Sequence, residues 1–157
     1  MENGIYLSPR RPIGKNSGYA DELRNAQILR DFGSTVYLAP ERNREKGKKH
    51  DAIVDGQVFE FKNTSGNANT LVTHFLRSRS QAPNVFINLE ASELTQREVI
   101  STLRRAMSRD THTDYNGNVI KGYTDSNQFA EGMIVLKLRG QNNLIYLDVN
   151  ELEKTGG

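Results

Sequence analysis

Three charged residues near the middle of the chain, Asp51, Glu60 and Lys62, have the side chains needed to act on a phosphate ester. Two carboxylates held close together repel each other, and a divalent cation relieves that repulsion by taking oxygen ligands from both. Such a cation can polarise a phosphoryl oxygen and lower the pKa of a bound water. Lys62 can then orient the nucleophile or stabilise the charge that develops. These residues therefore predict a divalent-metal site, with Mg²⁺ as the first candidate and Mn²⁺ or Zn²⁺ as alternatives.

A two-residue hairpin would bring these side chains together. Asp55-Gly56 is a strong signal for a type I′ turn, because both central residues of that turn need positive φ. In the register that the turn imposes, Asp51 lies opposite Glu60, about 5 Å away at Cβ, and Lys62 shares their face. An ordinary polar hairpin face with Lys62 paired to Glu60 is the competing interpretation. The residues expected on the opposite, core-forming face are Ala52, Val54, Phe59 and Phe61.

The composition is that of one polar globular domain. The chain has 157 residues, of which 36% are hydrophobic and 25% charged, which is enough to bury a core without covalent links. It has no cysteine, so disulfides and thiolate metal sites are excluded. The apolar runs are too short for a membrane span, and no hydrophobic signal segment is expected at the N-terminus. The net charge of +2 means that nucleic-acid binding would depend on local basic patches.

Periodicity and turn signals predict the remaining elements. We expect an irregular leader at 1–18, a single domain at 19–150 and a frayed tail at 151–157. Thr95 and Glu98 form a capping box at the start of a helix that continues through Met107. The segment 110–131 is long for a loop and could hold a small hairpin around Asn116-Gly117 or act as a substrate or partner loop. The other expected elements are a helix at 19–32, strands at 34–38 and 84–89, a helix at 70–80, and a terminal antiparallel pair at 133–138 and 144–149.

Basic side chains gather near this hairpin and on two helices. Lys48 and Lys49 come just before Asp51, where they could neutralise phosphate at the mouth of the site. The spacing of His74, Arg77 and Gln81 places them along one edge of the helix that follows Lys62, with Arg79 nearby, and predicts phosphate or base contacts there. A solvated helix face is the alternative for these residues. The helix after Thr95 carries the densest positive surface, which more often serves solubility than binding: Arg97, Arg104, Arg105 and Arg109.

The spacing of Asp51, Glu60 and Lys62 resembles the D…(D/E)xK signature of the PD-(D/E)xK nuclease superfamily, although His50 stands where many members have proline. The expected order of elements also resembles the αβββαβ core of that superfamily. The resemblance implies an α/β (α+β) restriction-endonuclease-like core with a mixed central sheet flanked by helices, plus the C-terminal strand pair. It further implies that an acidic residue of the first helix, Glu22, approaches a metal held by Asp51 and Glu60.

A second, narrower resemblance covers the residues that follow the hairpin. The run from Gly66-Asn-Ala-Asn69 through Ser80-Gln-Ala-Pro-Asn-Val85 looks like C-terminal toxin domains of contact-dependent growth inhibition (CdiA-type) systems. This resemblance implies an endonuclease toxin that cleaves nucleic acid, with tRNA favoured and DNA as the alternative. It also implies secretion as part of a larger effector, action in the target-cell cytoplasm, and neutralisation by a cognate immunity protein.

Three other functions stay open from the sequence. A metal-independent ribonuclease would use Lys62, His74 and Arg77 for acid–base catalysis and charge stabilisation. Its activity would persist in the presence of a chelator. A cellular nuclease of the same fold would need no immunity protein. A non-catalytic nucleic-acid-binding module would need basic residues alone, and Asp51 opposite Glu60 argues against it.

Overall fold

The computed structural model describes residues 4–7, 17–38, 52–79, 82–107, 111–113, 119–121 and 132–149. Three α-helices lie within these residues: α1 (Ser17–Asp31), α2 (Ala68–Arg79) and α3 (Gln96–Met107). The strands are β1 (Ile5–Leu7), β2 (Val36–Leu38), β3 (Ala52–Val54), β4 (Gln57–Asn63), β5 (Asn84–Leu89), β6 (Thr111–Thr113), β7 (Val119–Lys121), β8 (Met133–Leu138) and β9 (Ile145–Asp148). None of the helices in these ranges is long and apolar enough to cross a membrane.

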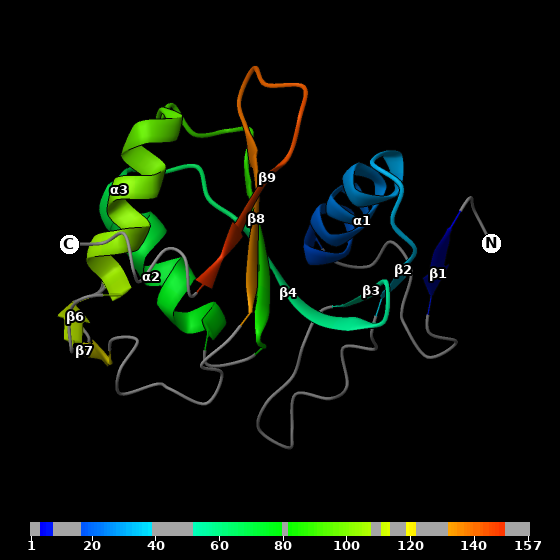
Figure 1. Ribbon diagram of the computed structural model, residues 1–157, viewed down its shortest axis with the longest axis horizontal. Coiled ribbons are helices and arrows are strands. Elements are labelled where there is room, and N and C mark those ends of the chain that lie inside the picture. The colour runs from blue at the N-terminus through cyan, green and yellow to red at the C-terminus, as the bar shows by residue number, and fades with distance from the viewer. Residues whose placement is uncertain are drawn as a thin grey trace.

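Seven of the described strands form one mixed sheet in the order β1-β2-β3-β4-β5-β8-β9. β2, β3 and β4 are antiparallel neighbours, whereas β4, β5 and β8 run parallel and end at the same edge. β9 returns antiparallel to β8, as the two C-terminal apolar runs predicted. Figure 1 shows α2 and α3 on one side of the sheet and α1 on the other. The predicted fold class, a mixed sheet flanked by helices with a C-terminal strand pair, is confirmed.

Each face of the sheet has its own apolar core. On one face, α2 and α3 pack through Phe75 and Leu103 against strand residues such as Ile87. On the other face, α1 packs through Leu29 against Phe59 and Phe61 of β4. Side chains alternate along a strand, so the residues between these two phenylalanines and after them lie on the α2 face. The polar residues of β4 are thereby held beside α2.

The central hairpin has the predicted turn and register. Asp55 and Gly56 have φ values of 50° and 85°, as a type I′ turn requires, and the Asp55 side chain accepts a hydrogen bond of 2.9 Å from the Thr35 backbone N–H. The three described strand pairs are Ala52 with Phe59, Ile53 with Val58, and Val54 with Gln57. All three agree with the register deduced from the turn. The predicted fourth pair, Asp51 with Glu60, includes a residue outside the described ranges.

The predictions for residues 1–18 and for the segment 110–131 have different outcomes. We expected residues 1–18 to be irregular, but Ile5–Leu7 forms β1, which pairs parallel to β2, and α1 begins at Ser17. A three-residue edge strand carries too little periodicity to be recognised in a segment rich in Gly and Pro. A strand pair within 110–131 is confirmed, because β6 pairs antiparallel with β7, whereas the predicted turn at Asn116-Gly117 lies outside the described residues.

Candidate functional site

A buried ion pair lies on the α2 face of β4. Glu60 is only 4% exposed. Its neighbours Phe59 and Phe61 are core residues on the opposite face of the strand. The Lys62 Nζ atom lies 3.6 Å from Glu60 Oε2, and the Lys62 side chain keeps 26% of its surface exposed. Their i, i+2 spacing on a strand is the reason that they share a face. A carboxylate held in the interior beside a partly exposed ammonium can orient that ammonium toward a ligand.

Helix α2 brings a histidine and a second cation to the same place. The Nδ1 atom of His74 shares a hydrogen bond of 2.8 Å with the Thr64 hydroxyl. Burial lowers the pKa of His74 below its usual value, and the positive charges of Lys62 and Arg77 lower it further. The imidazole is therefore neutral near pH 7. Since Thr64 engages Nδ1, Nε2 is the ring nitrogen placed to take or give a proton.

Thr64 is a site residue that the sequence analysis missed. It is 1% exposed, and its backbone N–H donates a hydrogen bond of 3.0 Å to the carbonyl of Asn88 at the end of the neighbouring strand. Glu60, Lys62 and Thr64 recur at every second position, so extending the strand alternation by one step would have identified the threonine. Its hydroxyl fixes the ring orientation of His74, which the sequence alone left unassigned.

The other predicted site residues are not all brought to this cluster. Glu22 belongs to α1, whose apolar residues pack on the face of Phe59 and Phe61, whereas Glu60 lies on the α2 face, and its approach to the site stays a prediction. Arg79, expected near the mouth, is 2% exposed and donates through Nη1 to the carbonyl of Pro83. Arg77 is exposed, as expected. The predicted residues Lys48, Lys49, Asp51 and Gln81 lie outside the described ranges.

The donor set was tested for the predicted divalent metal. Among the described residues, no group of three or more His, Asp or Glu side chains is arranged to hold a metal ion. Glu60 nevertheless offers a preformed carboxylate with restricted motion, and Mg²⁺ is commonly held by one or two carboxylates together with substrate phosphate and waters. Glu60 could serve as one such carboxylate, and the metal site stays a prediction because Asp51 lies outside the described residues.

A network of asparagines ties α1 to the sheet at the end of the strand that carries the site. Asn25 donates to Asn63 at 2.7 Å and accepts from Asn88 at 2.8 Å. Asn88 also receives the backbone N–H of Glu90 at 2.8 Å. Because Asn63 directly follows Lys62, this network holds the end of β4 in place.

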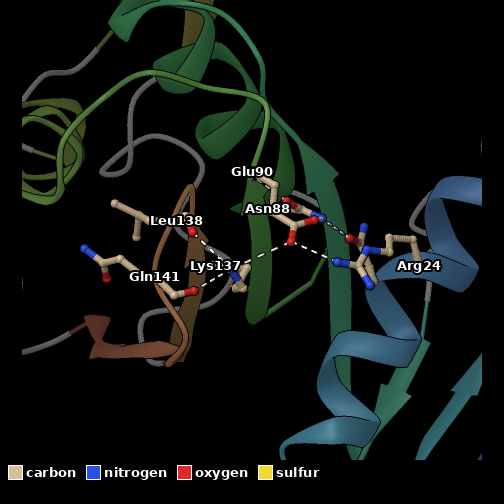
Figure 2. A network of polar contacts seen from close by, with 7 residues as sticks. Arg24, Asn88, Glu90, Lys137, Leu138 and Gln141 are labelled. Atoms are coloured by element: carbon tan, nitrogen blue, oxygen red, sulfur yellow. Dashed lines mark hydrogen bonds and ion pairs between the residues drawn. The ribbon is translucent and has the colours of Figure 1, made fainter.

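The network continues outward through charged groups. Figure 2 shows Glu90 between Arg24, which donates to it at 2.9 Å, and Lys137, whose Nζ lies 3.7 Å away. Hydrogen bonds from Asn88 and Arg24, and the charges of Arg24 and Lys137, hold the pKa of Glu90 below its usual value against the opposing effect of burial. Lys137 also donates to the carbonyls of Leu138 and Gln141 at 3.1 and 2.6 Å.

Substituting Asn88 by alanine is expected to destabilise the fold by about 2–4 kcal/mol, because it removes the partners of the buried Asn25 Oδ1 atom and of the partly buried Glu90 backbone N–H. Urea denaturation at pH 7 measures the loss. The matched control is Asn142→Ala, an exposed turn residue whose substitution should change stability by less than about 0.5 kcal/mol. Equal stability of the two variants would mean that the network contributes nothing.

Comparisons with known proteins concern the segment that carries the site and the fold as a whole. Residues 48–124 match the profile of the family described as "Contact-dependent growth inhibition CdiA C-terminal domain". That segment includes β3, β4, α2 and α3. No curated protein matches the chain.

Among solved structures, the chain is similar to a chain of the "CdiA-CT/CdiI toxin and immunity complex from Burkholderia pseudomallei". The identity is 18% and the TM-score 0.54, and the alignment covers 91% of this chain and 97% of that one. At this identity the likeness shows a shared fold.

Proposed function

We propose that this domain is an endonuclease toxin of a contact-dependent growth inhibition system, and that it cleaves phosphodiester bonds in tRNA, with DNA as the alternative substrate. The observation that carries the proposal is the cluster in which Lys62 lies between the buried carboxylate of Glu60 and a neutral His74. This cluster falls within the segment that matches the CdiA C-terminal family. The cluster would therefore be the catalytic site of the toxin domain.

The cluster supplies the groups that phosphodiester cleavage needs. Lys62 and Arg77 are cations on adjacent elements, and they would hold the scissile phosphate and stabilise its developing charge. His74 is kept neutral by burial and by the same cations, so its Nε2 atom can accept a proton from the attacking hydroxyl or water. Thr64 fixes the ring for that transfer through its contact with Nδ1.

We propose further that the reaction uses a divalent cation, Mg²⁺ in the first instance, held by Asp51 and Glu60 in the manner of PD-(D/E)xK nucleases. The cation would supply Lewis-acid polarisation of the phosphate and a bound water of lowered pKa. The agreement of three observed strand pairs with the predicted register supports this pairing of Asp51 with Glu60. Lys62, beside Glu60, would orient the nucleophile.

A metal-independent ribonuclease is the second candidate mechanism. The lowered pKa of His74 and its contact with Thr64 favour it, because an imidazole with a fixed ring and neighbouring cations can serve acid–base catalysis alone. In this mechanism Glu60 would serve to position Lys62. The two mechanisms differ in their response to a chelator.

The biological setting follows the same proposal. The domain would be delivered as part of a larger secreted effector, would act in the cytoplasm of the target cell, and would be held inactive in the producer by a cognate immunity protein. The similarity in fold to a chain of a toxin and immunity complex supports such a partner. A cellular nuclease of the same fold would act without one.

The test uses purified protein incubated separately with total tRNA and plasmid DNA, with and without EDTA. We expect cleavage of tRNA that EDTA abolishes and added Mg²⁺ restores. Cleavage that survives EDTA but is lost in His74→Gln would select the metal-independent mechanism. If neither polymer is cleaved under any of these conditions by folded protein, the proposed nuclease activity is wrong.

A further inference from the structure

A groove on the outer side of α3 lies apart from the site residues described above. It has a volume of about 480 Å³ and is lined by Gln96, Arg97, Ile100, Ser101 and Arg104. Arg97 and Arg104 are seven residues apart, which is close to two helical turns, so both lie on one side of the helix. No carboxylate is among the lining residues. The groove therefore presents two guanidinium groups and a hydroxyl along one line.

Arg104 differs from an ordinary solvated arginine. Its Nε–H is buried, yet within the described part of the chain it donates no hydrogen bond. Because that Nε–H is shielded from solvent, the terminal nitrogens of the guanidinium are the donors that a ligand in the groove could reach. Arg97, by contrast, is exposed at the other end of the groove. The pair combines a partly buried guanidinium with an exposed one.

We propose that this groove binds the phosphodiester backbone of the nucleic-acid substrate, outside the cleavage site. Guanidinium groups match phosphate oxygens in bidentate geometry, and a serine hydroxyl is a common additional donor to phosphate. Along the helix axis Arg97 and Arg104 are separated by about 10 Å, which corresponds to about three nucleotide steps of one strand. The lining contains no exposed aromatic ring, so the groove reads backbone charge and not base identity.

The position of α3 suits such a role. It packs directly against α2, the helix that carries His74 and Arg77, through residues such as Phe75 and Leu103. Both helices lie on the face of the sheet that holds Glu60 and Lys62, and Figure 1 shows α3 on the outer flank of this layer. Because the groove shares no lining residue with the cluster of Glu60, Lys62 and His74, a polymer that reaches both would gain contacts that a trinucleotide at the cleavage site would not. The groove thus selects for long substrates, and this inference rests on the proposed nuclease function.

The experiment measures binding and cleavage in the same proteins. Binding of total tRNA and of duplex DNA is followed at several salt concentrations in the Glu60→Gln background, in which cleavage is expected to be slow. In R97Q/R104Q we expect the affinity for the preferred polymer to fall about tenfold and the salt dependence to weaken by about 1.4–1.8 in the slope of log K against log salt. Cleavage of a trinucleotide, measured with Glu60 intact, should be unchanged by the same double substitution.

Three further variants sharpen the comparison. Arg139→Gln removes an exposed arginine from the turn between β8 and β9, and its polymer binding should stay at the wild-type value, unlike that of Arg97→Gln. Arg104→Lys keeps the charge but removes the planar guanidinium that binds phosphate in bidentate geometry, so it should retain only part of the affinity. Melting temperatures close to that of the wild type confirm that each variant is folded.

If wild-type protein cleaves the trinucleotide and R97Q/R104Q binds the polymer as tightly as the wild type does, the groove does not bind substrate. The proposed nuclease function would then still stand. Reduced trinucleotide cleavage in R97Q/R104Q would also overturn the proposal for the groove, because the effect would then lie at the cleavage site. Wild-type protein that cleaves neither polymer nor trinucleotide would overturn both proposals.

Discussion

Glu60→Gln is expected to lower the rate of nucleic-acid cleavage by about a hundredfold or more, because it removes the buried charge that orients Lys62 and would bind the cation. Glutamine has almost the same shape, so the packing between Phe59 and Phe61 is kept. Single-turnover cleavage with saturating protein isolates the chemical step from substrate binding. Circular dichroism and a melting curve show whether the variant is folded.

Glu93→Gln is the matched control for this substitution. Glu93 is an exposed carboxylate in the segment before α3, and neutralising it should leave the cleavage rate at the wild-type value. If Glu60→Gln also cleaves at the wild-type rate, Glu60 neither holds a metal nor positions Lys62. The charged pair on β4 would then be an ordinary ion pair of a strand surface, which was the competing interpretation of this hairpin.

Local chemistry was sufficient to predict the hairpin and most elements of the sheet. The turn at Asp55-Gly56 imposes one register between β3 and β4, and the alternation of side chains along β4 puts Glu60 and Lys62 on the same face. The capping box of α3 was equally local: the Glu98 side chain accepts from the Thr95 backbone N–H at 2.8 Å, and the Thr95 hydroxyl accepts from the Glu98 N–H at 3.2 Å.

The parts that could not be predicted depend on contacts between distant segments. Asn25, Asn63 and Asn88 form one network, yet no local pattern relates asparagines 38 and 63 positions from Asn25. The sequence also could not decide which face of the sheet α1 covers. Glu22 was assigned to the site by resemblance, and nothing in the sequence indicated that the apolar residues of its helix pack on the face opposite Glu60.

Arg79 illustrates the same limit of spacing arguments. The helical edge of His74 and Arg77 was predicted from intervals of three and four residues, and both residues do face the site region. Arg79 follows at an interval of two and turns inward, where the carbonyl of Pro83 accepts its hydrogen bond. Gly132 lies against the same place, and a Cβ atom there would overlap the Pro83 carbonyl. Only the three-dimensional packing reveals this arrangement.

Lys62→Met is expected to lower turnover strongly while substrate affinity changes little, if Lys62 acts on the nucleophile or on the charge of the transition state. Methionine keeps most of the apolar stem and removes the ammonium. Active-site charge stabilisation of this kind is worth about a hundredfold to a thousandfold in rate. A large loss of affinity with normal turnover would instead make Lys62 a phosphate anchor.

The same variant makes a second, independent prediction through His74. The positive charge of Lys62 disfavours protonation of the imidazole and thereby lowers its pKa, so removing the charge should raise the pKa of His74. NMR titration of the histidine ring protons measures this shift directly. In wild-type protein the acid limb of kcat/KM should lie below the pKa of an ordinary histidine, because catalysis needs the neutral ring. In Lys62→Met the acid limb of the residual activity should move to a higher pH.

Arg77→Met gives the graded comparison for this prediction. Its charge also lowers the pKa of His74 but contributes less than that of Lys62, so the titration should move in the same direction by a smaller amount. Arg97→Gln, on the outer side of α3, should leave the titration unchanged. If the pKa of His74 is unaltered in Lys62→Met, the charge of Lys62 does not act on the imidazole. The proposal that both side chains contact one phosphate would then be wrong.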